Sequence, residues 1–492
     1  MAGKLNVAVV TIACWSYSSA LLSAVLTVSN TSDVINGNVS SPAALIASPG
    51  PDGISFREAV LACNNATGPN RIEFADSLTG ATIRLVSPLS VDAPQLAIDA
   101  GPQPRVGIDV TGLPTGLGVR ESHVTISGLK ISGIEMGGAA LRIHADDKNI
   151  SVDDITIEHS EFHSTKRDGN PVAISVGMLS GTGLRVTNVT IANNLFDGVG
   201  GDGDAVHVPT SGTNSLVENL IVEDNIFQNC TFPVELVPGD GATGTHIRGT
   251  IVRHNTFLQN VQPVSIGTIA GTTRVAAANV IESTRIDSNL FIGSGNPAVI
   301  MGAGNGAMAT GNSIVDTEII NNIIVGCRIQ VTAGFEQARG NTIDRLRIIN
   351  NTITECQSGP AIFVTAGDDT LDDITNVVVL NTILWHNLND ILGLTVPQVR
   401  FTLTSIDRFV GQNGNISGDP LFRDPTHGDY VLRDGSPAID AGTSDGAPAF
   451  DRLGNARCDN LRVPNRGAGA APRTDLGALE APCSGRRRSV AK

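Results

Sequence analysis

Positive charge is scarce in this sequence, and that scarcity excludes one class of function. Charged residues make up only 16% of the 492 residues, and the formal net charge is −15 at pH 7. A chain of this charge repels a phosphate backbone. The only dense basic run, residues 486–488, lies at the extreme C-terminus and reads as a solvated tail. The composition therefore argues against nucleic-acid binding.

Long apolar runs are also absent after the N-terminal segment, so we expect no transmembrane segment there. Residues 1–24 themselves resemble a secretory signal peptide, with Lys4 as the positive region, residues 5–14 as the apolar stretch and small residues near Ala24 as a cleavage site. A short membrane anchor and a lipid-modified Cys14 are the alternatives. We therefore expect a secreted or cell-surface protein.

Cysteine is sparse and unpatterned, which argues against a zinc site or a redox motif. No CxxC or Cys/His zinc spacing occurs among the seven cysteines. Removal of the leader with Cys14 leaves six, which we interpret as structural in a compartment that permits disulfides. A disulfide between Cys458 and Cys483 is the candidate for holding the C-terminal segment in place.

Glycine, in contrast, is abundant: 54 glycines accompany a hydrophobic content of 41%. This balance favours many short strands joined by tight turns over helices. A chain of this length can form two or three ordinary domains, or one solenoid with a continuous core.

An internal repeat favours the solenoid. A short β-branched segment is followed by a polar residue, an asparagine, one further residue and then Phe or Ile, at a spacing of about 30 residues. The repeat asparagines are Asn194, Asn225, Asn255, Asn289, Asn322, Asn351 and Asn381, with Ser160 in a weaker earlier copy. Asparagines in register can hydrogen-bond along a stack, so we interpret them as structural rather than catalytic. Their Cα atoms are expected to form a line at the spacing of β-strands.

A second β-branched segment follows each repeat asparagine, and its alternation places the third residue outward. We therefore predict an all-β, right-handed parallel β-helix over residues 25–418. A short capping helix is expected at about 55–64, where Ser55 and Glu58 have capping-box spacing. Residues 419–492 lose the repeat and are expected to form an irregular C-terminal closing segment and a basic tail.

Two segments resemble a known group of exported proteins. GISFREAVLACNNATGPNRIEF is similar to the SLREAI-type segment that precedes β-helix repeats, and DPLFRDPTHGDYVLRDGSPAIDAG with TDLGALE is similar to the choice-of-anchor Q segment. The resemblance implies a right-handed, pectate lyase-like β-helix. It leaves the chemistry open, because the group mixes polysaccharide-degrading enzymes, adhesins and uncharacterised surface proteins.

Rows of outward residues on successive coils show where function can lie. Two rows, Arg285–Glu318–Arg347 and Glu223–Arg253–Asp287, alternate in sign and are predicted to be cross-coil ion-pair ladders. A third row belongs to the second strand and gathers its polar residues in the first five coils: Arg142, Ser175, His207, Glu235, Ser265, Ile300, Gln330 and Phe363.

The third row supplies the candidate site. His207 and Glu235 are expected to be neighbours, and the glycine-rich turn before His207 adds Asp202 and Asp204. We assign Asp202, Asp204, His207 and Glu235 as candidate catalytic residues: two carboxylates suit a glycoside hydrolase, and a histidine base suits a lyase. The alternative is that these residues have no catalytic role: the aspartates belong to ordinary Asp-Gly turns, and the histidine is simply solvated.

Two further assignments complete the prediction. Arg142 is the candidate for binding a substrate carboxylate, and Asp197, Asp202 and Asp204 are candidates for holding calcium. The expected function is an exported β-helix protein that engages polysaccharide or a cell-surface glycan, with lyase or hydrolase activity. The alternative is a noncatalytic adhesin or surface-structural protein, which a low aromatic content of 4% favours.

Overall fold

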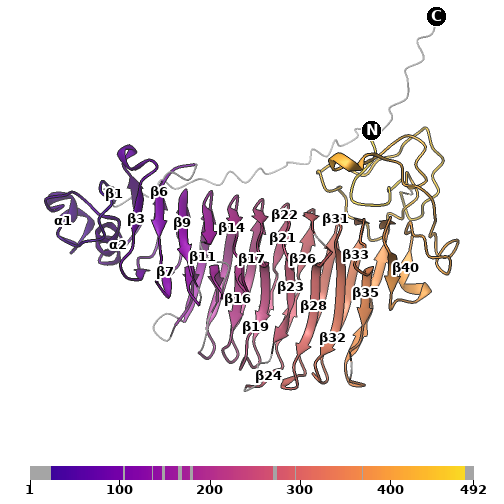
Figure 1. The fold of residues 1–492 in the computed structure, drawn as a ribbon, viewed down its shortest axis with the longest axis horizontal. Helices are drawn as coiled ribbons and strands as arrows, with labels where there is room; N and C mark the ends of the chain where they lie inside the picture. Colours follow the sequence, from indigo (N-terminus) through magenta and orange to yellow (C-terminus); the bar gives the residue numbers. More distant parts are fainter. Residues whose placement is uncertain are drawn as a thin grey trace, which may run out of the picture.

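The computed structural model shows a right-handed parallel β-helix, drawn in Figure 1 as a row of coils with helices at the N-terminal end and long loops at the C-terminal end. It describes residues 24–102, 106–135, 137–146, 150–164, 169–177, 181–269, 274–293, 295–367, 369–471 and 473–482. Each coil contributes one strand to each of three parallel sheets, A, B and C. The predicted fold class is confirmed, whereas the predicted leader lies outside the described residues.

The three sheets account for nearly all of the strands. Sheet A has 16 strands, several of them halves of one interrupted strand: β1 (Ala24–Val28), β2 (Asn70–Phe74), β5 (Leu96–Asp99), β8 (Val124–Ser127), β11 (Ser151–Glu158), β14 (Arg185–Ala192), β17 (Leu216–Glu223), β20 (His246–Arg248), β21 (Ile251–Arg253), β25 (Val280–Glu282), β26 (Arg285–Asp287), β30 (Ser313–Ile320), β33 (Thr342–Ile349), β36 (Asp373–Thr375), β37 (Val378–Leu380) and β40 (Val399–Arg400). Sheet B has 11: β3 (Thr82–Arg84), β6 (Val106–Asp109), β9 (Leu129–Ile134), β12 (Glu161–Ser164), β15 (Leu195–Asp197), β18 (Ile226–Gln228), β22 (Thr256–Leu258), β27 (Leu290–Ile292), β31 (Ile323–Val325), β34 (Thr352–Thr354) and β38 (Ile383–Trp385). Sheet C also has 11: β4 (Leu89–Val91), β7 (Thr115–Val119), β10 (Ala139–Ile143), β13 (Val172–Val176), β16 (Asp204–Thr210), β19 (Phe232–Pro238), β23 (Val264–Ile269), β28 (Pro297–Asn305), β32 (Arg328–Phe335), β35 (Pro360–Thr365) and β39 (Asn389–Leu392).

The ends of the solenoid are covered by other elements. Helix α2 (Phe56–Asn64) starts at a capping box formed by Ser55 and Glu58, as predicted, and a second short helix, α1 (Pro42–Ala47), packs beside it. The C-terminal segment contains the antiparallel pair β41 (Phe422–Asp424) and β42 (Asp429–Leu432). Remaining short elements are η1 (Asp76–Leu78), η2 (Val396–Gln398), η3 (Pro425–His427), β24 (Ala276–Ala277) and β29 (Ala309–Thr310).

The repeat asparagines form a buried hydrogen-bonded ladder at the turn between sheets A and B. The Oδ1 atom of Asn225 accepts from both the backbone N–H and the Nδ2 group of Asn194, at 2.9 and 3.1 Å. The same pair of bonds repeats up to Asn351. The residue before each ladder position adopts a left-handed conformation, as Asn193 does at φ 56°. The structural interpretation of these asparagines is therefore confirmed.

One ladder assignment is wrong. Strand β38 pairs with β34 so that Thr352 lies opposite Ile383, which places Thr382 opposite Asn351. The Thr382 hydroxyl accepts from the backbone N–H of Asn351 at 3.4 Å. Asn381 occupies the left-handed position at φ 50° and donates to the carbonyl of Thr443 in the C-terminal segment.

The residue after each ladder position begins a strand that points an aromatic or aliphatic side chain into the core. Five phenylalanines, Phe162, Phe196, Phe227, Phe257 and Phe291, stack with ring centroids 4.7 to 5.0 Å apart. They are buried, with exposed fractions of 0 to 1%. The repeat's Phe or Ile is therefore the central packing residue of each coil.

The cysteine register also follows the prediction. The pairing of β31 with β34 stacks Cys327 on Cys356, and Cys230 lies three coils from Cys327. All three are buried free thiols, as is Cys63. Cys458 is disulfide-bonded, but its predicted partner, Cys483, lies outside the described residues.

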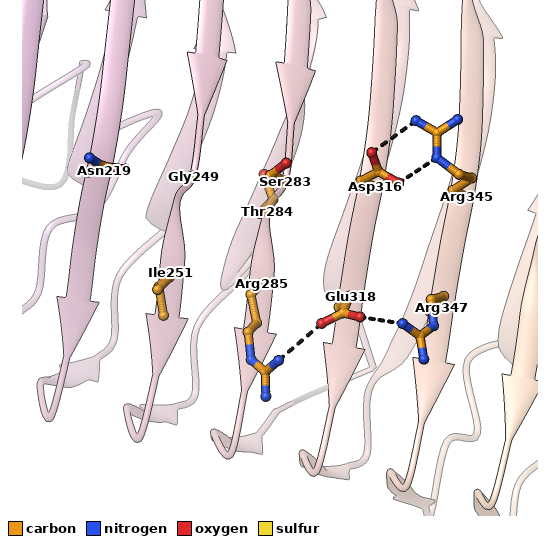
Figure 2. Close-up of a pocket in the computed structure, with 10 residues that line it drawn as sticks. All are labelled: Asn219, Gly249, Ile251, Ser283, Thr284, Arg285, Asp316, Glu318, Arg345 and Arg347. Atoms are coloured by element: carbon orange, nitrogen blue, oxygen red, sulfur yellow. Dashed lines mark hydrogen bonds and ion pairs between the residues drawn. The ribbon is translucent and has the colours of Figure 1, made fainter. Parts of the chain in front are cut away.

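The outer face of sheet A carries the predicted ion-pair ladders (Figure 2). Glu318 bridges Arg285 at 3.0 Å and Arg347 at 2.7 Å, while Arg345 pairs with Asp316. Glu223 and Arg253 pair across another coil boundary at 2.5 Å, whereas Asp287, the third member of that predicted row, pairs with Arg285 of its own strand at 2.7 Å. A depression in this face is lined by the charged side chains of Arg285, Asp316, Glu318, Arg345 and Arg347. Because they pair with one another, these charges stabilise coil register rather than present a free charge to a ligand.

Candidate functional site

The candidate site lies on the outer face of sheet C, where the predicted row of side chains is confirmed position by position. Strand pairing places Arg142 opposite Ser175, Ser175 opposite His207 and His207 opposite Glu235. The row continues through Ser265, Ile300, Gln330 and Phe363. Inward neighbours such as Val206 and Val208 are buried, which fixes His207 on the outer face.

Three side chains converge in this row. The imidazole of His207 lies between Asp204, whose Oδ2 is 3.3 Å from Nδ1, and Glu235, whose Oε2 is 3.4 Å from Nε2. Carboxylate oxygens of Asp204 and Glu235 also lie within 4.8 Å of one another. Gly203 permits this approach, because a Cβ atom there would lie 2.5 Å from the carbonyl oxygen of Pro171. Strands β16 and β19 therefore bring together three side chains, Asp204, His207 and Glu235, which we call the trio.

Burial perturbs all three members of the trio. Desolvation, reinforced by the nearby charge of Glu235, raises the pKa of Asp204 to about 10. Desolvation also raises the pKa of Glu235 and lowers the pKa of His207 to about 4. At neutral pH the two carboxyl groups therefore hold a proton between them, and the imidazole is neutral.

The other predicted site residues are not all part of this trio. Asp202 is exposed in the preceding turn, and its charge contributes to the raised pKa of Asp204. Asp197 belongs to β15 in sheet B, where it accepts from Asn229 Nδ2 at 3.3 Å and lies 3.9 Å from His163. Sequence spacing suggested that Asp197 was near Asp204, but the intervening turn leads from one sheet to another.

Arg142 lies on the face that carries the trio, two coils before His207. Its Nε atom is buried without a hydrogen-bond partner, and desolvation lowers its pKa. His144, the next outward residue on the chain, likewise has a buried Nδ1 atom without a partner. Both residues are half-buried on this outer face, where the Arg142 guanidinium group adds positive charge.

A divalent cation has one cluster of candidate ligands among the described residues. Atoms of Asp204, His207 and Glu235 all lie within 4.8 Å of one another, and Asp204 Oδ1 is buried without a partner. A set of two carboxylates and an imidazole suits zinc or manganese better than calcium, which prefers oxygen ligands alone. The predicted calcium set shares only Asp204 with this cluster, so calcium binding stays a prediction.

A groove of about 250 Å³ continues from Glu235 along sheet C. It crosses β19, β23, β28 and β32, and its lining includes Ser265, Gly302, Asn305, Gln330 and Phe335. Ser265 and Gln330 belong to the predicted row. The sequence did not identify Asn305 and Phe335 as site residues, because they lie at strand ends beyond the part of the coil that repeats.

Comparisons with known proteins give no family assignment. No protein-family model and no curated protein matches the chain. Among solved structures, the pectate lyase Pel9A is 13% identical over 93% of this chain and 96% of its own, with a TM-score of 0.38. The family 6 alginate lyase AlyGC is 16% identical over 84% of this chain and 55% of its own, with a TM-score of 0.44. PfbA, a surface adhesin of Streptococcus pneumoniae, is 12% identical over 72% and 91%, with a TM-score of 0.36.

Helices in the described part of the chain are short. None has the length and apolar character needed to cross a membrane.

Proposed function

We propose that this protein is a secreted or cell-surface enzyme that binds an acidic polysaccharide along sheet C and cleaves it by β-elimination. The observation that carries the proposal is the trio itself: a neutral imidazole held between two carboxyl groups, at the end of an open groove. An imidazole that is neutral at pH 7, beside carboxyl groups that retain a proton, places a base and an acid side by side.

The short separation of the carboxyl groups favours elimination over hydrolysis. Glycoside hydrolases place their two carboxyl groups about 5 to 9.5 Å apart, so that the glycosidic bond fits between them. Carboxylate oxygens of Asp204 and Glu235 instead lie within 4.8 Å of one another. They act as one proton-holding unit, which leaves His207 as the base.

The proposed reaction requires one proton to be taken and one to be given. His207 removes the proton from the carbon next to the carboxylate of a uronate sugar. The electron pair forms a carbon–carbon double bond as the adjacent bond to the next sugar's oxygen breaks. The proton held by the carboxyl pair passes to that leaving oxygen through Glu235, which lines the groove. Transfer from the imidazolium back to the carboxyl pair then restores the resting enzyme.

Arg142 supplies positive charge for the substrate carboxylate. It lies two strand spacings from His207, about 10 Å along the stack, on the same face of sheet C. A carboxylate bound beside this half-buried guanidinium group gains a charge-assisted interaction. The chemistry of the site therefore selects a uronate-containing polymer.

The test is a panel of polysaccharides incubated with the purified protein, with and without added calcium, zinc or manganese. Polygalacturonate and alginate serve as acidic polymers, and dextran serves as the neutral control. Elimination produces new reducing ends together with the ultraviolet absorbance of an unsaturated sugar, whereas hydrolysis produces reducing ends alone. Binding of polymer without either product would contradict the proposal and favour the adhesin function.

A further inference from the structure

We propose that the groove beyond Glu235 is a subsite for an uncharged sugar, so that the polymer presents an acidic residue toward Arg142 and a neutral or esterified residue toward Phe335. This inference rests on the proposed function for the direction of the chain. It adds a substrate class: a polysaccharide whose acidic residues have uncharged neighbours. Four observations on the groove carry it.

The first observation is the shape of the groove floor. Gly302 faces outward two residues after Ile300. On the neighbouring coils its paired residues are Gly267 and Thr332, which also have small side chains or none. A Cβ atom at Gly302 would meet nothing closer than the Thr332 carbonyl oxygen at 3.9 Å. The space above Gly302 is therefore open, and no packing requirement of the fold explains why it is empty.

The second observation is a pair of unsatisfied polar atoms in the groove residues. Ser265 Oγ and Asn305 Oδ1 are buried and have no hydrogen-bond partner. Leaving such groups unpaired is energetically unfavourable. The strand pairing sets Asn305 four residues farther along the strand than Ser265, about 13 Å. The two atoms therefore mark separate points of the groove at which sugar hydroxyls, which both donate and accept, can bind.

The third observation is the charge of the lining. Glu235 is the only ionisable side chain among the described residues that line the groove. Arg328 lies beside the groove but does not line it, and its guanidinium group donates to the Oε1 atom of Gln330 at 3.1 Å. A carboxylate on the groove floor would therefore lose its hydration without a cationic lining residue to pair with. The groove therefore disfavours an acidic sugar, in contrast to the Arg142 side of the trio.

The fourth observation is an exposed aromatic ring at the far end of the groove. Phe335 is 53% exposed and lies on the coil after Asn305, directly opposite it in the strand pairing. Ile266, Ile300 and Met301 add apolar groups to the same lining. The Phe335 ring offers an apolar surface on which the carbon–hydrogen face of a sugar ring can pack.

The experiment measures binding in a His207→Ala background, so that the result does not depend on cleavage. The probes are oligosaccharides of polygalacturonate and of alginate, each as the free acid and as the partial methyl ester. Gly302→Leu fills the floor without a backbone clash, and Phe335→Ala removes the ring. The matched control is Phe450→Ala, because Phe450 is similarly exposed at 57% but does not line the groove.

We expect the partial esters to bind more tightly than the free acids. Gly302→Leu should weaken ester binding at least about tenfold, and Phe335→Ala about three- to tenfold. Phe450→Ala should leave it unchanged, and all variants should keep the melting temperature of the parent. Equal binding of esters and acids, unchanged affinity in both groove variants, or no binding of any probe would overturn the subsite.

The outcomes separate the subsite from the proposed function. If groove variants weaken binding but the unmodified protein cleaves none of the polymers, the elimination proposal fails and the subsite stands. If the protein cleaves an acidic polymer and Gly302→Leu alters neither its KM nor probe affinity, the subsite fails and the elimination proposal stands.

Discussion

His207 and Glu235 occupy the same position on successive coils, with Nε2 and Oε2 3.4 Å apart. Asp204 lies 3.3 Å from the other ring nitrogen. A neutral imidazole has one donor and one acceptor, so it cannot donate to both carboxyl groups. It donates to one of them and keeps its other nitrogen as the acceptor that the proposed reaction uses, while the raised pKa of Asp204 leaves a proton on the carboxyl pair. This shared proton underlies the first three predictions.

Removal of either His207 or Glu235 should abolish cleavage without unfolding the protein. Both side chains point outward from sheet C, so His207→Ala and Glu235→Ala leave the core intact. We expect kcat/KM on the cleaved polymer to fall at least about 100-fold. His246→Ala is the control, because it removes an exposed histidine that lies 3.8 Å from Glu282 on sheet A. Cleavage that survives both trio variants would move the active site elsewhere.

The pH dependence of kcat/KM should be bell-shaped and broad. His207 acts as a base only when deprotonated, and its pKa is lowered to about 4, so activity should rise through that value. The carboxyl pair acts as an acid only while it holds a proton, so activity should fall as pH approaches the Asp204 pKa of about 10. A pH series of kcat/KM measures both limits. An acidic limit near pH 6.5, the ordinary histidine value, would show that the imidazole is solvated.

Glu235→Gln tests the coupling that sets the alkaline limit. The charge of Glu235 helps to raise the pKa of Asp204, so its removal should move the titration of Asp204 to lower pH. This shift can be followed by the pH dependence of the Asp204 carboxyl signal in NMR, even if the variant is inactive. A titration that does not move would show that the two carboxyl groups are independent.

The trio should also reduce stability at high pH. Asp204 has a folded-state pKa raised above its unfolded value, so its contribution is most favourable below about pH 4 and is lost as pH rises toward about 10. Asp204→Asn removes this penalty, and we expect it to raise the free energy of unfolding at pH 8 by on the order of 1–3 kcal/mol. Denaturant titrations at pH 5 and pH 8 measure the difference. A variant that is less stable at both values would contradict the assignment.

The sequence predicted the fold and the row because both follow from the repeat. Once the coil length was known, the alternation of each strand determined which residues faced outward. The same outward position on each coil is occupied by Arg142, His207 and Glu235. Asn381 was wrongly assigned to the ladder because the sequence Asn-Thr-Ile matches the repeat when Asn381 is taken as the ladder asparagine. Strand pairing shows that the next residue, Thr382, occupies the ladder position. The groove depends on Asn305 and Phe335, whose placement at strand ends has no periodic signal.

The asparagine ladder gives a final prediction, on stability. Asn289 is fully buried, accepts from the N–H and the Nδ2 group of Asn255, and donates to the Val252 carbonyl oxygen at 2.8 Å. Asn289→Ala leaves these groups unpaired in the core, so we expect a loss of about 2–4 kcal/mol in the free energy of unfolding.

Two comparison variants make the ladder prediction specific. Asn289→Thr keeps a hydroxyl acceptor, as Thr382 does for the N–H of Asn351, and should lose less stability than Asn289→Ala. Asn36→Ala removes an exposed asparagine that donates one side-chain hydrogen bond, to Asp52 at 2.7 Å, and should change stability by less than about 0.5 kcal/mol. Denaturant unfolding followed by circular dichroism measures all three. If Asn289→Ala were as mild as Asn36→Ala, the ladder would not be what holds the turns of neighbouring coils in register.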